Sequence, residues 1–87
     1  MQQPIEMICY HDENGNIRPY RFKMKGDTGE SITVRVRNIV DKKEEKIVGT
    51  QYLIYYCLCA VNDTLRTFKV RFKKDTCQWY LVRIIEG

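Results

Sequence analysis

The sequence contains no long run of apolar residues. Its longest mostly apolar stretch, Thr50 to Val61, has twelve residues, whereas a membrane helix needs about 18 or more. Near the N-terminus, Pro4 and Glu6 interrupt the chain before the hydrophobic region of a secretion signal can form. Internal repeats, low-complexity segments and linkers are also absent. We therefore expect one soluble, cytoplasmic domain over residues 1–87, with no membrane contact.

Motifs that support catalysis are missing as well. The only histidine, His11, stands beside two acidic residues at a predicted turn, but the nearest serine is Ser31 and no glycine-rich nucleophile turn accompanies it. Gly26 and Gly29 bracket a turn that precedes no helix, so they do not form a phosphate loop. The sequence predicts a protein that is not an enzyme and that carries no cofactor.

The four cysteines lack the spacing of a zinc site. Cys9, Cys57, Cys59 and Cys77 lie within or beside predicted strands among apolar neighbours, and no pair has the Cys-x-x-Cys spacing. They are expected to be free thiols that pack as small apolar side chains. If the strand of Cys9 and His11 lay next to that of Cys57 and Cys59, three thiols and one imidazole could bind zinc. Because the Cys-x-x-Cys spacing is absent, we predict no metal.

What the sequence does contain is alternation with the period of a β-strand. The stretch Thr50 to Val61 is apolar on both alternating sets of residues and rich in tyrosine, which favours a strand over a helix. A strand that is apolar on both sides must be covered on both sides. It therefore belongs in the middle of a sheet, in a closed barrel, or at a contact with another chain.

The first two strands, predicted over 5–11 and 17–25, are expected to form a hairpin, because Asn14-Gly15 between alternating runs is a strong hairpin signal. With these two residues at the centre of the turn, the predicted pairs are Ile5 with Met24, Met7 with Phe22 and Cys9 with Tyr20 inside, and Glu6 with Lys23 outside. Pro19 has no amide hydrogen, so it is expected at an edge or a bulge.

Further strands are predicted from Ser31 onward and over 50–61, 65–74 and 77–85. Residues 38–49 are ambiguous. Asp41 can cap a short helix that ends at Gly49, or the flanking strands extend into a long hairpin with a charged tip at 42–46 and a bulge at Gly49. We favour the hairpin, because mixed charges suit a solvated tip.

These elements predict an all-β fold of about six antiparallel strands in meander order. So much two-sided apolar strand in 87 residues indicates a small SH3-like or OB-like barrel, or a strongly curled sheet. An open sheet that is buried against a second copy of the chain is the competing arrangement.

The net charge is +4, and the basic residues gather on predicted strands. Alternation places seven of them at outward positions, and we expect these cations from separate strands to converge on a common side of the sheet, namely Arg21, Lys23, Arg35, Arg37, Lys69, Arg71 and Lys73. Tyr52 and Tyr56, or else Tyr55, are expected beside the last three, depending on the length of the turn after Val61. A basic strand face with interleaved tyrosines is typical of proteins that bind single-stranded nucleic acid. The alternative is a solvated face whose charges only keep the sheet edges soluble.

Trp79, Tyr80 and Leu81 form a second stretch that is apolar on both sides. They either close the core, with Trp79 at one end of the barrel, or form a homodimer face together with Tyr52–Tyr56. The second interpretation defines the alternative function, a protein-interaction or homodimeric adaptor domain.

The run from Asn14 to Phe22, NGNIRPYRF, and the closing strand with Trp79 resemble segments of small all-β proteins of Gram-positive bacteria whose function is unknown. The resemblance covers two short parts of the chain. It implies an all-β fold and no particular activity.

Overall fold

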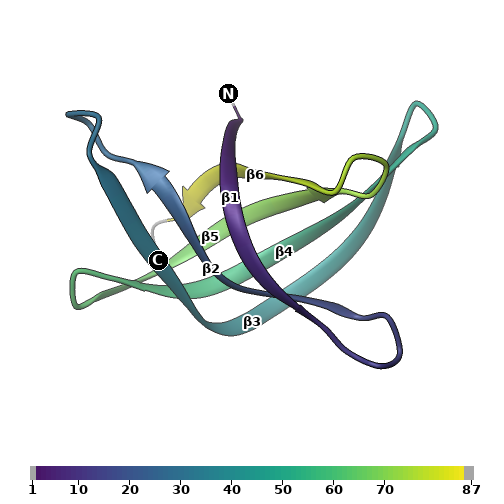
Figure 1. Ribbon diagram of the computed structural model, residues 1–87, viewed down its shortest axis with the longest axis horizontal. Coiled ribbons are helices and arrows are strands. Elements are labelled where there is room, and N and C mark those ends of the chain that lie inside the picture. The colour runs from purple at the N-terminus through teal and green to yellow at the C-terminus, as the bar shows by residue number, and fades with distance from the viewer. Residues whose placement is uncertain (1, 86–87) are drawn as a thin grey trace.

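Six antiparallel strands make up the computed structural model, which describes residues 2–85 (Figure 1). They are β1 (Gln3–His11), β2 (Ile17–Lys25), β3 (Ser31–Ile47), β4 (Thr50–Val61), β5 (Thr64–Lys73) and β6 (Gln78–Ile85). Each strand pairs with the next, and β6 pairs with β1, so the sheet closes into a barrel. This confirms the predicted all-β meander and excludes the open sheet. Within residues 2–85 no helix is long and apolar enough to cross a membrane.

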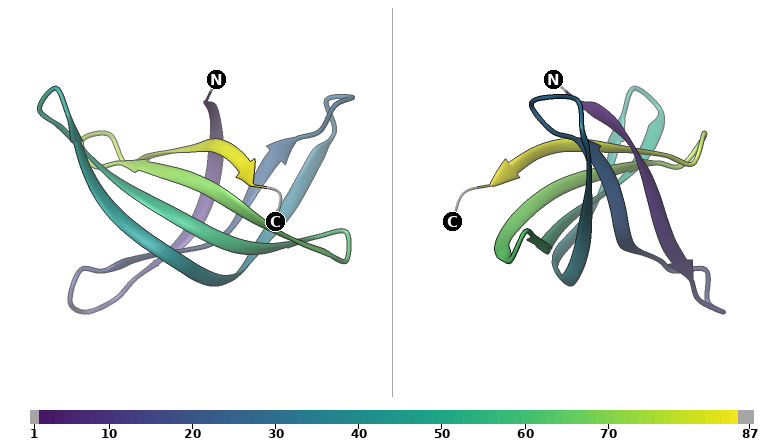
Figure 2. Two further views of the ribbon diagram at one scale, coloured as in Figure 1. Left: turned by 180° about the vertical axis from the view of Figure 1, so that it is seen from behind. Right: turned by 60° about the vertical axis from the view of Figure 1, so that its left-hand side comes forward.

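The barrel consists of two layers of strands that cross each other. Figure 1 shows β1, β2 and the first half of β3 running steeply in front of β4, β5 and β6, and Figure 2 shows the same two layers from other sides. β3 is strongly bent and belongs to both layers. Its pairing with β4 is irregular at Arg37 and at Val40, which have no partners in the ladder. Bulges bend a strand and increase its twist, so these two residues explain how one strand serves both layers.

Aromatic side chains fill the space between the layers. Phe22 of β2 meets Phe68 of β5 edge to face, with ring centroids 5.7 Å apart. Trp79 of β6 packs against Phe72 at 4.8 Å and against Tyr55 at 5.5 Å. Small residues complete the core, namely Val34, Cys57, Cys59 and Val70, all fully buried. One alternating set of β4 and one of β5 therefore form a single core.

The first hairpin closes through a three-residue loop, so the prediction of a two-residue Asn14-Gly15 turn was wrong. The amide of Asp12 donates to the carbonyl of Asn16 at 3.0 Å, and Gly15 has a φ of +82°. The Asp12 carboxylate accepts hydrogen bonds from the amides of Asn14 and Asn16 at 2.9 and 2.8 Å. These bonds satisfy the backbone of the longer loop and lower the pKa of Asp12. Gly15 supplies the left-handed residue with which such a loop ends.

A bulge at Tyr20 shifts the ladder by one residue and restores the predicted register beyond it. Glu6 pairs with Lys23 and Met7 with Phe22, as expected, but Cys9 pairs with Pro19. The predicted Cys9–Tyr20 pair was therefore wrong. The β1–β2 ladder ends at Glu6 and Lys23, one residue short of the predicted Ile5–Met24 pair, and on its other side Ile5 pairs with Trp79 of β6. Pro19 is buried next to this bulge, in agreement with the position expected for a residue that has no amide hydrogen. Tyr20 points outward as a result.

Residues 38–49 form a long hairpin, as we favoured, but its tip lies further along than expected. Val48 and Gly49 are the two central residues of the turn, with φ values of +47° and +83°, and residues 42–46 are paired with β4. The charged segment is therefore the end of a strand, and Gly49 is a turn residue where a bulge was expected. Two successive positive φ values are typical of the turns whose twist matches that of a hairpin.

Candidate nucleic-acid interface

The basic residues divide into two groups on different layers of the barrel. Arg21, Lys23 and Arg35 lie on the outer side of β2 and the first half of β3, and Lys69, Arg71 and Lys73 lie on the outer side of β5. Arg37 occupies the first bulge of β3. The expectation that all these cations share one side was wrong, since the layers cross and their outer faces point in different directions (Figure 2). The two faces must be judged separately.

The side chains of the second outer face cover one another. We call it the β4–β6 face and define it by the outward residues Tyr52, Ile54, Tyr56, Lys69, Arg71, Lys73 and Tyr80. Ile54 is only 2% exposed although it lies outside the core. Its partners across the two ladders are Lys43 and Arg71. The long apolar stems of such residues cover apolar surface while their charged ends stay at the solvent. These cations therefore supply the second cover that β4 requires.

The tyrosines of this face are already occupied by cations. The ammonium groups of Lys43 and Lys69 lie 5.5 and 5.7 Å from the ring centroid of Tyr56. The guanidinium of Arg71 lies 5.1 Å from that of Tyr52 and 4.0 Å from the Glu45 carboxylate. Tyr52 and Tyr56 do lie beside the β5 cations, as predicted, because the turn after Val61 has two residues. However, cation–π contacts and an acidic partner already engage most of these groups.

We define the β1–β3 face by the outward residues Glu6, Ile8, Tyr10, Tyr20, Arg21, Lys23 and Arg35. Its cations make no ion pair or cation–π contact within the described residues, although Glu6 lies opposite Lys23 across the β1–β2 ladder. Arg21 lies directly opposite Arg35 across the β2–β3 ladder. Among residues 2–85, no carboxylate lies within ion-pair distance, 4.0 Å, of Arg21, Lys23 or Arg35. Two like charges opposed across a ladder destabilise the sheet by a few tenths to about 1 kcal/mol. An anion between the two guanidinium groups would remove that repulsion.

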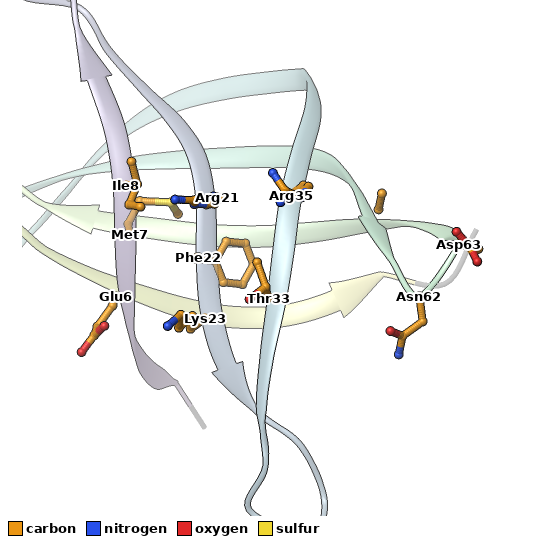
Figure 3. Close-up of a pocket in the computed structure, with 11 residues that line it drawn as sticks. Glu6, Met7, Ile8, Arg21, Phe22, Lys23, Thr33, Arg35, Asn62 and Asp63 are labelled. Carbon is orange, nitrogen blue, oxygen red and sulfur yellow. The ribbon is translucent and has the colours of Figure 1, made fainter.

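A hollow of about 800 Å³ lies beside this pair of arginines. Figure 3 shows Arg21 on β2 and Arg35 on β3 at the same level of the sheet, with Asn62 and Asp63 beyond β3 at the β4–β5 turn. Lys23 also borders the hollow, and Glu6 and Asp63 are its two acidic residues. The lining therefore carries three cations and two anions, and all three cations lie on the wall formed by β2 and β3. This arrangement suits an anionic group bound against that wall.

Tyr55 does not belong to either face. It is 1% exposed inside the barrel and packs against Trp79. A buried ring offers no surface for a nucleobase, so its assignment as an alternative stacking residue was wrong. The reason is the register, because the two-residue turn at Asn62-Asp63 places Tyr52 and Tyr56 outside and Tyr55 inside.

The candidate homodimer residues are also divided by the barrel wall. Trp79 and Leu81 lie in the core, 6% and 8% exposed, and Tyr80 lies outside opposite Arg71. Trp79 and Leu81 therefore close the core, which is the first of the two interpretations of this stretch. They offer no surface to a second chain while the barrel is closed, so a docking face in this region is reduced to Tyr80 and the half-buried tyrosines of β4.

The thiols and the histidine do not assemble a metal site within the described part of the chain, where no three His, Cys, Asp or Glu side chains lie close enough to hold an ion. Cys57 and Cys59 are fully buried in the core. Cys9 lies near the barrel wall with its Sγ atom 3.6 Å from Nε2 of His11. Burial raises the pKa of Cys9.

Two residues of the β1–β3 face were missed by the sequence reasoning. Tyr10 and Tyr20 are outward and 58% and 39% exposed, although alternation placed Tyr20 in the core. The only available signal was Pro19, because a proline that marks a bulge also predicts a shift in the alternation of its neighbours. Comparison of the chain with protein-family models, with curated proteins and with solved structures found no match.

Proposed function

We propose that this protein is a non-enzymatic binding module that holds single-stranded nucleic acid against its β1–β3 face. The observation that carries the proposal is the pairing of Arg21 with Arg35, for which no carboxylate within residues 2–85 lies at ion-pair distance, with Lys23 nearby and opposite Glu6. Guanidinium groups bind phosphate oxygens through paired hydrogen bonds, so a phosphate is the natural ligand for two opposed arginines. Lys69, Arg71 and Lys73, the three predicted cations of β5, are assigned a structural role.

The size of the hollow supports one phosphate chain. Three cations border a space of about 800 Å³ on one curved wall, which offers room for a single strand and leaves none of its cations for the second chain of a duplex. The Thr33 side chain and the turn residue Asn62 add neutral polar groups to the lining. Such groups commonly position a sugar–phosphate backbone without reading its sequence.

The test is a salt titration of binding to a fluorescein-labelled 15-mer of thymidylate. Removal of two phosphate contacts in R21A/R35A makes the slope of log affinity against log salt shallower by about 1.4, since each contact to a single strand contributes about 0.7. The matched control is K69A/K73A, which lowers the net charge by the same amount on the other face and should bind almost as well as the original protein.

Two results would overturn the proposal. One is the absence of salt-dependent binding by the original protein, and the other is an equal loss of affinity in both double variants, which would indicate attraction by net charge alone. A mass that rises with protein concentration, without binding of nucleic acid, would favour the alternative of a homodimeric adaptor domain.

A further inference from the structure

Tyr10 and Tyr20 form an exposed aromatic pair at one end of the β1–β3 face. Their ring centroids are 5.3 Å apart with an angle of 59° between the planes. Both rings are exposed, Tyr10 more than Tyr20, although each could bury most of its ring in a core. Rings that hold each other in place and remain open to solvent form a rigid surface on which another flat group can stack.

The bulge in β2 is what places this pair outside. Tyr20 is the extra residue between Pro19 and Arg21, so two successive side chains of β2 point outward. Without the extra residue, alternation would direct Tyr20 into the core opposite Cys9. Bulges often redirect a side chain next to a binding site. Here the bulge places a ring immediately beside one of the two opposed arginines.

These rings differ from the tyrosines of β4 in having no cation over them. Tyr52, Tyr55 and Tyr56 each lie within 6 Å of a lysine or arginine charge. Within residues 2–85 no such contact engages Tyr10 or Tyr20. Arg18 lies across the ladder from Tyr10, and Arg21 lies across from Ile8, two residues before Tyr10. The open rings are therefore flanked by positive charge.

Resting on the proposed function, we infer that the Tyr10–Tyr20 pair is the base-stacking part of the site. A strand whose phosphates bind between Arg21 and Arg35 would place an unpaired base on the ring of Tyr10. Stacking on an aromatic ring tolerates any base, because every base has a flat π-face. The ligand class is thus single-stranded nucleic acid of little sequence preference. A duplex would bind more weakly, because its bases are paired and stacked on one another.

The experiment compares two oligomers that carry the same number of phosphates. One is the 15-mer of thymidylate, and the other is an abasic chain of the same length. The original protein should bind the thymidylate chain about tenfold more tightly, within the range measured for base–aromatic stacking. Y10L should remove that advantage while its affinity for the abasic chain and its salt dependence stay unchanged, and Y10F, which keeps the ring, should retain it.

The matched control is Y80L, which removes an outward tyrosine from the other face and should leave both affinities unchanged. Equal affinity of the original protein for the two oligomers, or an unaffected Y10L, would overturn the stacking role, whereas a loss of binding in R21A/R35A would still support the phosphate site. If neither oligomer binds, the proposed function fails and the inference fails with it. Circular dichroism of each variant distinguishes a lost ring from a lost fold.

Discussion

Tyr55 of β4 donates a hydrogen bond of 2.6 Å to the carbonyl of Ile17 of β2, across the inside of the barrel. The two strands are not neighbours in the sheet, so this bond connects the layers directly. Burial raises the pKa of Tyr55 to about 12. The neutral hydroxyl is therefore favoured in the folded state, and the free energy of unfolding depends on pH through this group.

The pH dependence follows from the sign of that shift. The pKa of Tyr55 is higher in the folded state than its ordinary value of 10.0, so the stability it contributes is complete below pH 10 and is lost as the pH rises toward 12. Y55F lacks the hydroxyl and should be less stable by about 1 kcal/mol at pH 7. Urea unfolding at pH 7 and at pH 10.5–11.5 should show this difference shrinking. A difference that stays constant over the range would contradict the assignment.

Arg21 and Arg71 should affect stability in opposite ways. R71A uncovers Ile54 and removes the contact with Tyr52, and because the Arg71 side chain is only 16% exposed we expect a loss of about 1–2 kcal/mol. R21A removes a charge opposite Arg35 and should be neutral or stabilising by up to about 1 kcal/mol. Chemical denaturation of both variants checks this contrast. Equal destabilisation would mean that the β1–β3 arginines are structural as well.

Replacement of Val48 by asparagine should stabilise the β3–β4 hairpin. Val48 is fully exposed with a φ of +47°, and a β-branched side chain in this region is strained by about 1 kcal/mol or more. V48N should raise the melting temperature by roughly 4–8 °C per kcal/mol gained in a domain of this size. V40N is the control, because Val40 is also exposed but lies in the strand. A comparable gain in both variants would exclude relief of backbone strain as the cause.

The four thiols should differ in reactivity in the folded protein. Cys77 is exposed in the β5–β6 turn and should react at once with a disulfide reagent at pH 8. A side-chain hydrogen bond that Cys57 donates to Cys59, followed by burial, raises the pKa of Cys57, and both of these thiols lie in the core. They should react only on unfolding, with the half-buried Cys9 between the extremes. C77S should abolish the fast phase, and a fast phase that persists would show that the core opens.

Much of the fold could be predicted from alternation, but curvature could not. The bounds of β2 and β4 and the outward positions of Arg21, Lys23 and Arg35 follow from a period of two, because side chains of a strand point alternately to its two sides. Alternation distinguishes inside from outside. It does not say in which direction an outer face points, since that depends on the bulges at Arg37 and Val40 that bend β3. The separation of the cations into two faces was therefore missed.

Local hydrogen bonds explain the remaining differences at the turns. Asp12 accepts two backbone hydrogen bonds that favour a three-residue loop over the two-residue turn that Asn14-Gly15 suggests. The mixed charges at 42–46 indicated solvent exposure correctly, but an exposed strand end and a turn have the same composition. The arginines of the candidate site were predicted, but its exposed tyrosine pair was missed. The bulge at Tyr20 adds one residue to the strand and reverses the orientation that alternation predicts for that side chain.

The β1–β6 contact that completes the barrel consists of three residue pairs, Gln3 to Leu81, Pro4 to Tyr80 and Ile5 to Trp79, whereas β3 and β4 share eleven. Because this ladder is so short, its hydrogen bonds can open while the other five ladders remain intact. The first excursion from the native state should therefore release β1 from β6, and amide hydrogens at this joint should exchange with deuterium ahead of those in β4. A nucleic acid bound across β1 and β3 would span only ladders that stay closed in this opening, so it should leave the exchange at the β1–β6 joint unchanged.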